Sequence, residues 1–86
     1  PVSYPDMAKS FIGGYRPVAA SAARAATTRY DKFQIRWDGP WLIAESDREK
    51  ILVVPCGPNA LCTNDAAIHF SPNGARIGEL LFEKWF

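Results

Sequence analysis

The fold is decided by residues 51–82, which read ILVVPCGPNALCTNDAAIHFSPNGARIGELLF. A β-branched run opens this stretch, and Pro55 ends the run because proline cannot donate a hydrogen bond to a neighbouring strand. Cys56 and Cys62 then bracket a five-residue loop. A Pro-Asn-Gly sequence further on is typical of a tight turn between two strands. The stretch therefore predicts three strands, which are Ile51 to Val54, Ala66 to Ser71 and Ala75 to Phe82.

Two helices are predicted before this stretch. The sequence Ser3-Tyr4-Pro5-Asp6 is typical of a helix start, because serine can cap the helix and proline suits its first turn. That helix ends at Gly13-Gly14, and Met7 and Phe11 are expected to point inward. The second and longer helix, Val18 to Tyr30, repeats mostly small residues at every fourth position, and such a face can lie close to a sheet. The predicted inward face consists of Val18, Ala22, Ala26 and Tyr30.

The hydrophobic period then changes from that of a helix to that of a strand. Phe33, Ile35 and Trp37 alternate with polar residues, which indicates a strand with one buried face. Asp38-Gly39 is a strong hairpin signal, and Trp41 to Glu45 is the predicted return strand.

These elements predict an α+β fold in a single domain, residues 1–86, with one disulfide. Helices that precede all the strands usually cover one face of an antiparallel sheet. The chain ends on Trp85 and Phe86, which either cap the core or belong to an interface. The expected architecture is two N-terminal helices packed on a roughly five-stranded antiparallel β-meander, with strands at Phe33 to Trp37, Trp41 to Glu45, Lys50 to Val54, Ala66 to Ser71 and Ala75 to Phe82.

Composition and cysteine usage indicate the compartment. The 86 residues are 48% hydrophobic and 22% charged, which suits one folded domain. No apolar run reaches the roughly 18 residues that a membrane-spanning helix needs. The chain begins at Pro1 without an initiator methionine, which favours a mature protein whose leader was removed. Two close cysteines favour a disulfide and a secreted or periplasmic location, with two reduced cysteines in a cytosolic protein as the alternative.

Charge is distributed unevenly along the chain. Residues 1–36 contain six basic and two acidic residues, whereas residues 37–86 contain four basic and seven acidic ones. A basic segment can mark a face that binds nucleic acid. Here the cations are spaced along the predicted second helix, and no basic motif with interleaved aromatics follows. The pattern favours a solvated helix face, and no nucleic-acid partner is expected.

The loop between the cysteines is the candidate binding site. A disulfide between Cys56 and Cys62 would close a small ring, and a loop that is shaped before it meets a partner has a lower ordering cost on binding. We expect Leu61 to be its apolar anchor and Asn59 to form hydrogen bonds within a cleft. A disulfide that only pins a crossover between strands is the alternative. The predicted binding residues are Gly57, Pro58, Asn59, Ala60 and Leu61.

Metal binding and catalysis are not predicted. Five residues between the cysteines exceed the usual zinc-ligand spacing of about 2 to 4, and His69 is the only histidine, so a four-ligand site cannot be completed from these residue types. A nucleophilic pair of either cysteine with His69 lacks an orienting partner. His69 alternates with apolar neighbours, which predicts a solvent-facing position in its strand. We expect no cofactor, no metal and no enzymatic activity.

One part of the chain resembles a known family. The run Cys56-Gly57-Pro58-Asn59-Ala60-Leu61-Cys62, followed by Ala67 to Gly74 and Gly78 to Leu81, is similar to the core of the Ivy-type inhibitors of vertebrate lysozyme. The resemblance implies a bacterial periplasmic protein with an antiparallel sheet, packed helices and a disulfide-closed loop that plugs the active-site cleft of the lysozyme. The family's loop is one residue shorter and contains a histidine, whereas this loop contains none.

Three functions are compatible with these features. The leading hypothesis is a small exported binding protein, inhibitor-like or immunity-like, that blocks a partner protein through the cysteine loop. The candidate partner is a lysozyme or another cell-wall hydrolase. The alternative is a secreted effector that binds a host protein through a sheet edge, and the third is a small cysteine-dependent enzyme. The expected partner is thus another protein, and a homo-oligomer is compatible with the sequence.

Overall fold

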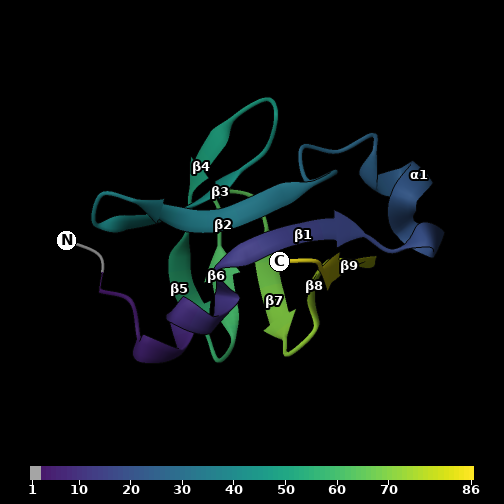
Figure 1. Cartoon of the computed structure of the whole chain (residues 1–86). Coiled ribbons are helices and arrows are strands. Elements are labelled where there is room, and N and C mark those ends of the chain that lie inside the picture. Colours follow the sequence, from purple (N-terminus) through teal and green to yellow (C-terminus); the bar gives the residue numbers. More distant parts are fainter. Residues whose placement is uncertain (1–2) are drawn as a thin grey trace.

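The computed structural model describes residues 3–86, and these residues form one nine-stranded antiparallel sheet (Figure 1). The elements in chain order are the 3₁₀-helix η1 (Asp6–Phe11), β1 (Gly13–Pro17), the 3₁₀-helix η2 (Ala19–Ser21), α1 (Ala22–Ala25), β2 (Phe33–Asp38), β3 (Trp41–Glu45), β4 (Lys50–Leu52), β5 (Val54–Gly57), β6 (Ala60–Cys62), β7 (Ala67–Ser71), β8 (Gly74–Ile77) and β9 (Leu80–Lys84). The strand order across the sheet is β4-β3-β2-β1-β9-β8-β7-β6-β5. The sheet curls so that β1 and β2 run across β5, β6 and β7, which gives a nearly closed, barrel-like shape.

The predicted α+β fold is wrong, because the described residues are mostly β-structure. Two short 3₁₀-helices and one turn of α-helix replace the two predicted N-terminal helices. The five predicted strands become nine because two of them are divided, and because β1 and β6 are added. Within residues 3–86, no helix is long and apolar enough to cross a membrane.

The helix predicted from Val18 to Tyr30 is much shorter than expected. Only residues 19–25 are helical, in η2 and α1. The hydroxyls of Thr27 and Thr28 each donate to a carbonyl three residues earlier, at 2.8 Å, and such side-chain bonds compete with continuation of the helix. The buried alanine is Ala25, whereas the alanines predicted to face inward, Ala22 and Ala26, are exposed.

The first predicted helix is present only as η1. Pro5 is its N-cap residue and no side chain caps it, so the predicted serine cap is wrong. Phe11 is buried as predicted, but Met7 is 50% exposed instead of pointing inward.

Strand β1 lies where the sequence predicts a helix stop and a connection. It pairs with β2 on one side and with β9 on the other, for example through Arg16↔Glu83. Two glycines and a proline give this segment little intrinsic preference for a strand. Its conformation therefore depends on partners that are distant in sequence, and β1 joins β2–β4 to the C-terminal strands.

The sheet closes on itself at Val53. The strand predicted from Lys50 to Val54 is divided there, because β4 pairs with β3 whereas β5 pairs with β6 at the opposite edge of the sheet. The Val53 side chain is fully buried. Its amide donates to the Leu42 carbonyl at 3.1 Å, and its carbonyl accepts from the Tyr4 hydroxyl at 2.5 Å. Consecutive strands thus form the two edges, and the sheet must curl for one residue to connect them.

The predicted hairpins are confirmed in part. β2 and β3 pair as expected, with Gly39 in the turn at φ 62°. β7 and β8 pair around Pro72-Asn73, so the turn lies where it was predicted, but Gly74 of the predicted Pro-Asn-Gly turn is the first residue of β8. The strand predicted from Ala75 to Phe82 is instead the two strands β8 and β9, because Gly78, at φ 60°, begins a new turn. His69 is exposed on β7, as its alternation with apolar residues predicts.

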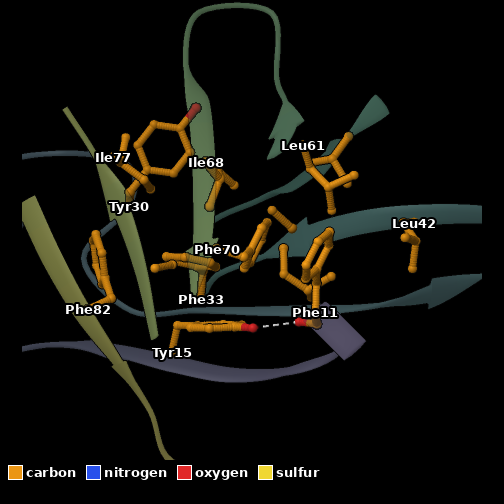
Figure 2. Close-up of a cluster of buried hydrophobic side chains, with 14 of the residues drawn as sticks. Phe11, Tyr15, Tyr30, Phe33, Leu42, Leu61, Ile68, Phe70, Ile77 and Phe82 are labelled. Carbon is orange, nitrogen blue, oxygen red and sulfur yellow. Dashed lines mark hydrogen bonds between the residues drawn. The ribbon is translucent and has the colours of Figure 1, made fainter. Parts of the chain in front are cut away.

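An aromatic cluster fills the barrel (Figure 2). The ring centroid of Phe33 lies 5.2 Å from that of Tyr15 and 5.1 Å from that of Phe82. Phe11 stacks on Phe70 of β7 at 4.3 Å, so η1 contributes to the same core. The Tyr15 hydroxyl donates to the Phe11 carbonyl at 2.7 Å, and burial raises the pKa of Tyr15. The cluster therefore connects β1, β2, β7 and β9.

Ion pairs connect the basic first part of the chain with the acidic remainder. Four arginines of the first 36 residues pair with acids from the remainder of the chain. The opposite charges of the two parts thus meet across the sheet and its loops. The pairs are Arg16 with Glu83, Arg24 with Glu79, Arg29 with both Glu49 and Asp65, and Arg36 with Glu45.

Candidate functional site

The segment between the cysteines is the tip of a β-hairpin. β5 pairs with β6, and the last pair, Gly57↔Ala60, follows an irregularity in the register. Such a bulge adds one unpaired residue to a strand, here Cys56. The turn between the strands is Pro58-Asn59. Cys56 and Cys62 therefore lie on neighbouring strands just below the tip.

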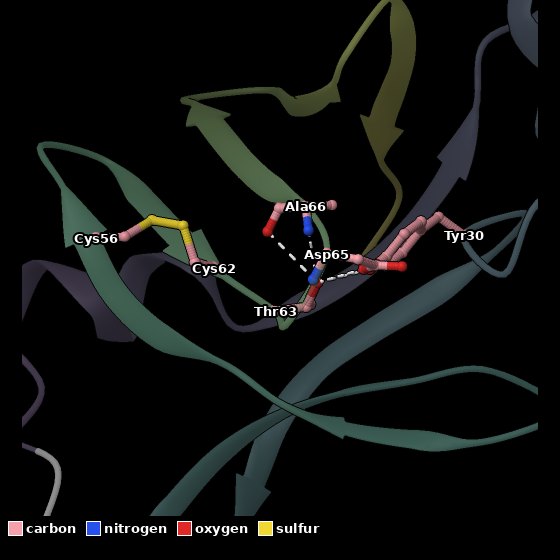
Figure 3. The surroundings of a disulfide bond; sticks show 6 residues. All are labelled: Tyr30, Cys56, Cys62, Thr63, Asp65 and Ala66. Carbon is pink, nitrogen blue, oxygen red and sulfur yellow. Dashed lines mark hydrogen bonds between the residues drawn. A yellow bond between two sulfur atoms is a disulfide. The ribbon is translucent and has the colours of Figure 1, made fainter.

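The predicted disulfide joins Cys56 to Cys62, with their Cα atoms 5.7 Å apart (Figure 3). These are the only two cysteines of the chain, so neither carries a thiol in this structure. A cysteine nucleophile would require reduction of this bond, because the thiolate is the reactive form. The bond cross-links the two strands of the hairpin and restricts its tip.

Reducing this disulfide is expected to loosen the hairpin without unfolding the domain. A ring this small contributes roughly 2 kcal/mol on the chain-entropy model. Neither sulfur belongs to the core, since Cys56 is exposed and Cys62 only half-buried. Urea denaturation with and without reductant measures the change in stability, and amide hydrogen exchange at Gly57 and Asn59 measures the loosening. Complete unfolding on reduction would contradict this expectation.

The tip exposes three of the five predicted binding residues, namely Gly57, Pro58 and Asn59. Asn59 has φ 55°, in the left-handed region that the second central residue of a type II turn requires, and proline is common at the first. The Asn59 carbonyl accepts from the Phe70 amide at 2.8 Å, which ties the tip to β7. The side-chain amide of Asn59 is therefore presented on a fixed backbone.

The other two predicted binding residues, Ala60 and Leu61, are buried instead, and Leu61 belongs to the core cluster. They are 5% and 1% exposed. Leu61 lies in the buried cluster in Figure 2, because its side chain points to the inner face of the curled sheet. The expected apolar anchor thus cannot contact a partner, and the exposed tip offers Asn59 as its hydrogen-bonding side chain.

A hydrogen-bonded network fixes the base of the hairpin (Figure 3). The Thr63 hydroxyl accepts from the amides of Asp65 and Ala66 at 3.3 and 3.1 Å. The Tyr30 hydroxyl donates to the Asp65 carboxylate at 2.7 Å and lies 2.7 Å from the Thr63 hydroxyl. Arg29 adds an ion pair to the same carboxylate at 3.0 Å. The network ties the segment after α1 to the β6–β7 turn.

This network is expected to make stability fall in acid. Hydrogen bonds from Tyr30, Thr63 and Arg29 lower the pKa of Asp65. A carboxyl group with a lowered folded-state pKa contributes stability above its unfolded pKa of about 3.9, and the contribution is lost as the pH falls through the folded value. The free energy of unfolding of Asp65→Asn should therefore change less steeply between about pH 2 and pH 5 than that of the wild type.

Urea titrations at several pH values measure these slopes. Asp47→Asn is the matched control, because Asp47 is an exposed carboxyl outside the network. Equal slopes for Asp65→Asn and the wild type would contradict the expectation.

The two edges of the sheet differ in the backbone groups that they expose. The Val53 amide bonds to β3, and bonded positions alternate along an antiparallel pair. The backbone groups of Lys50 and Leu52 therefore point away from β3. At the other edge, β5 contains Pro55, which has no N–H to donate. Of the two edge strands, β4 is thus the one open to a further strand.

In the part of the chain that the structure describes, no group of three or more His, Cys, Asp or Glu side chains is placed to hold a metal ion. Comparison of the chain with protein-family models, with curated proteins and with solved structures gives no match.

Proposed function

We propose that this domain is a small exported binding protein that blocks a partner protein, a lysozyme or another cell-wall hydrolase, with the tip of the β5–β6 hairpin. The observation that carries this proposal is the disulfide-clamped tip, where Gly57, Pro58 and Asn59 are exposed. A disulfide is typical of proteins from an oxidising compartment, which supports export.

Such a tip suits insertion into a concave site. It is narrow and uncharged, and its fixed backbone lowers the ordering cost of binding. Glycoside hydrolases carry a pair of carboxyl groups in their clefts. The side-chain amide of Asn59 has N–H groups that can donate to a carboxylate. The tip therefore has both the shape and the donor that a block of such a cleft requires.

Inhibition assays test the proposal. The oxidised domain should slow the clearing of a peptidoglycan suspension by at least one purified hydrolase of a panel that begins with a vertebrate lysozyme. Asn59→Gly tolerates the left-handed backbone and removes the amide, so inhibition should weaken about tenfold or more, which is about 1.4 kcal/mol. The matched control is Asn73→Gly, the same change after a proline in the β7–β8 turn, and it should inhibit like the wild type.

Two results would contradict the proposal. One is full inhibition by Asn59→Gly, since the tip would then contribute nothing. The other is the absence of inhibition by the wild type against every hydrolase of the panel.

A second candidate is an effector that binds a host protein through β4. It is favoured by the outward backbone groups of Lys50 and Leu52 and by the Leu52 side chain, which is 47% exposed, since both suit strand addition. Leu52→Pro removes an N–H group that points outward, and it leaves the hydrogen bonds between β4 and β3 in place. Loss of partner binding in Leu52→Pro, with full binding in Asn59→Gly, would favour this candidate over the hairpin.

A further inference from the structure

A groove on the outer face of β1, β2 and β3 is separate from the hairpin. Its volume is about 400 Å³, within the range of small-ligand sites. Trp85 and Phe86 line one side, and the Ser46-Asp47 bend after β3 contributes to the lining. No residue of β5 or β6 lines it. The groove can therefore be tested independently of the hairpin tip.

The register of three strands builds the floor of the groove. Gly14 pairs with Gln34, and Gln34 pairs with Glu45, so these positions form one row across the sheet. Trp85 extends the row, because its amide donates to the Gly14 carbonyl at 3.0 Å. A Cβ at Gly14 would overlap the rings of Trp85 and Phe86. The absence of a side chain at Gly14 thus lets both rings lie against β1.

The rings of Trp85 and Phe86 lie against β1 and are nevertheless exposed to solvent. Trp85 is 44% exposed and Phe86 is 63% exposed. Arg16 and Lys32 lie 5.1 and 4.9 Å from the centroid of the Trp85 ring, and such cation–π contacts favour one ring position. The Trp85 ring is thus held in place, and together with Phe86 it forms an aromatic wall at the groove.

The polar side chains of the groove offer hydrogen bonds, and most of its charged groups are paired within the protein. Arg36 donates twice to Glu45, at 2.7 and 3.1 Å, which orients the carboxylate and lowers the pKa of Glu45. Gln34 is half-buried in the same row and carries both a donor and an acceptor. Lys32 and Asp47 add one charge of each sign to the lining. Arg16 beside Trp85 is paired with Glu83, and Lys50 lies 3.9 Å from Glu45, so most charges in and beside the groove already have an oppositely charged partner within the protein.

We propose that this groove binds a neutral saccharide. A sugar ring has an apolar C–H face that can pack against an aromatic ring, and it has hydroxyl groups that can donate to carboxylates and exchange hydrogen bonds with an amide. Trp85 provides the apolar contact, whereas Gln34, Glu45 and Asp47 provide the hydrogen bonds. Because most of these charges are already paired within the protein, the groove favours a neutral ligand over an acidic or basic one.

Titration of the ¹⁵N-labelled domain with neutral trisaccharides tests the proposal. The probes are β-1,4-linked glucose, β-1,4-linked N-acetylglucosamine and α-1,4-linked glucose. At least one should give saturable shifts, at millimolar concentration, of the Gly14 and Gln34 amides and of the Trp85 indole N–H. The amides of the hairpin tip, residues 57–60, should not shift.

Two variants locate the binding. Trp85→Ala should weaken saccharide binding about tenfold or more, because it removes the apolar wall. Trp37→Ala is the matched control, since Trp37 is a comparably exposed tryptophan, at 40%, outside the groove, and it should bind like the wild type. Gln34→Ala keeps the aromatic wall and should weaken binding about fivefold, so the test stands even if Trp85→Ala does not fold.

Three outcomes would overturn the proposal. The first is no saturable shift with any of the three sugars, and the second is wild-type affinity in both Gln34→Ala and a folded Trp85→Ala. The third is tighter binding of a trilysine or triglutamate peptide at the same residues, which would assign the groove to a charged peptide.

Discussion

Replacing Leu61 by alanine is expected to lower the free energy of unfolding by about 2 to 5 kcal/mol, the usual effect of truncating a buried leucine. The side chain is 1% exposed and belongs to the core cluster. Its neighbours are the other packed side chains of this cluster, which can relax only partly around the cavity. Urea denaturation followed by far-ultraviolet circular dichroism measures the change.

Leu81→Ala is the matched control for this substitution. Leu81 lies on β9 and is 49% exposed, so the same truncation should cost less than about 1 kcal/mol. If Leu61→Ala proves as stable as Leu81→Ala, Leu61 is not buried, and its earlier interpretation as an exposed anchor would have to be reconsidered.

Replacing Phe33 by alanine is expected to lower the free energy of unfolding by about 3 to 5 kcal/mol. Phe33 is 3% exposed, and its ring centroid lies within 5.2 Å of those of Tyr15 and Phe82. The ring therefore connects β2 with β1 and β9, the strands through which the two parts of the sheet join. Urea denaturation measures the loss, and the near-ultraviolet circular dichroism of the aromatic cluster should weaken with it.

Phe86→Ala is the control for the loss of an aromatic ring. Phe86 is 63% exposed, so its removal should cost about 1 kcal/mol or less. Equal destabilisation by Phe33→Ala and Phe86→Ala would contradict the placement of Phe33 in the core.

Local pattern predicted the elements whose partners are close in sequence. The alternation from Phe33 to Trp37 and the Asp38-Gly39 signal correctly predicted the β2–β3 hairpin. The spacing of Cys56 and Cys62 correctly predicted the disulfide, because few residues separate the two. In both cases the two interacting segments are joined by a short loop, so the loop geometry largely determines how they pair.

The candidate site was predicted in part for the same reason. A proline followed by an asparagine is a recognisable type II turn signal, and it could have located the tip at Pro58-Asn59. The burial of Leu61 had no such signal. Strand β6 has three residues, too few to show a period of two, and the core side chains that bury Leu61 come together only in the folded sheet.

By itself, the sequence determined the β2–β3 and β7–β8 hairpins, the disulfide and the exposure of His69, since each follows from contacts or alternation within a few residues. Only the tertiary structure decided that Gly13–Pro17 is a strand, that the helix after Val18 ends at its first turn, and that Val53 connects the two edges of the sheet. The physical reason is that the first and last of these depend on pairing between distant segments, and burial in a shared core can override weak local propensity. The groove beside Trp85 was likewise decided only by the tertiary structure, because its walls come from β1, β2, β3 and the C-terminus.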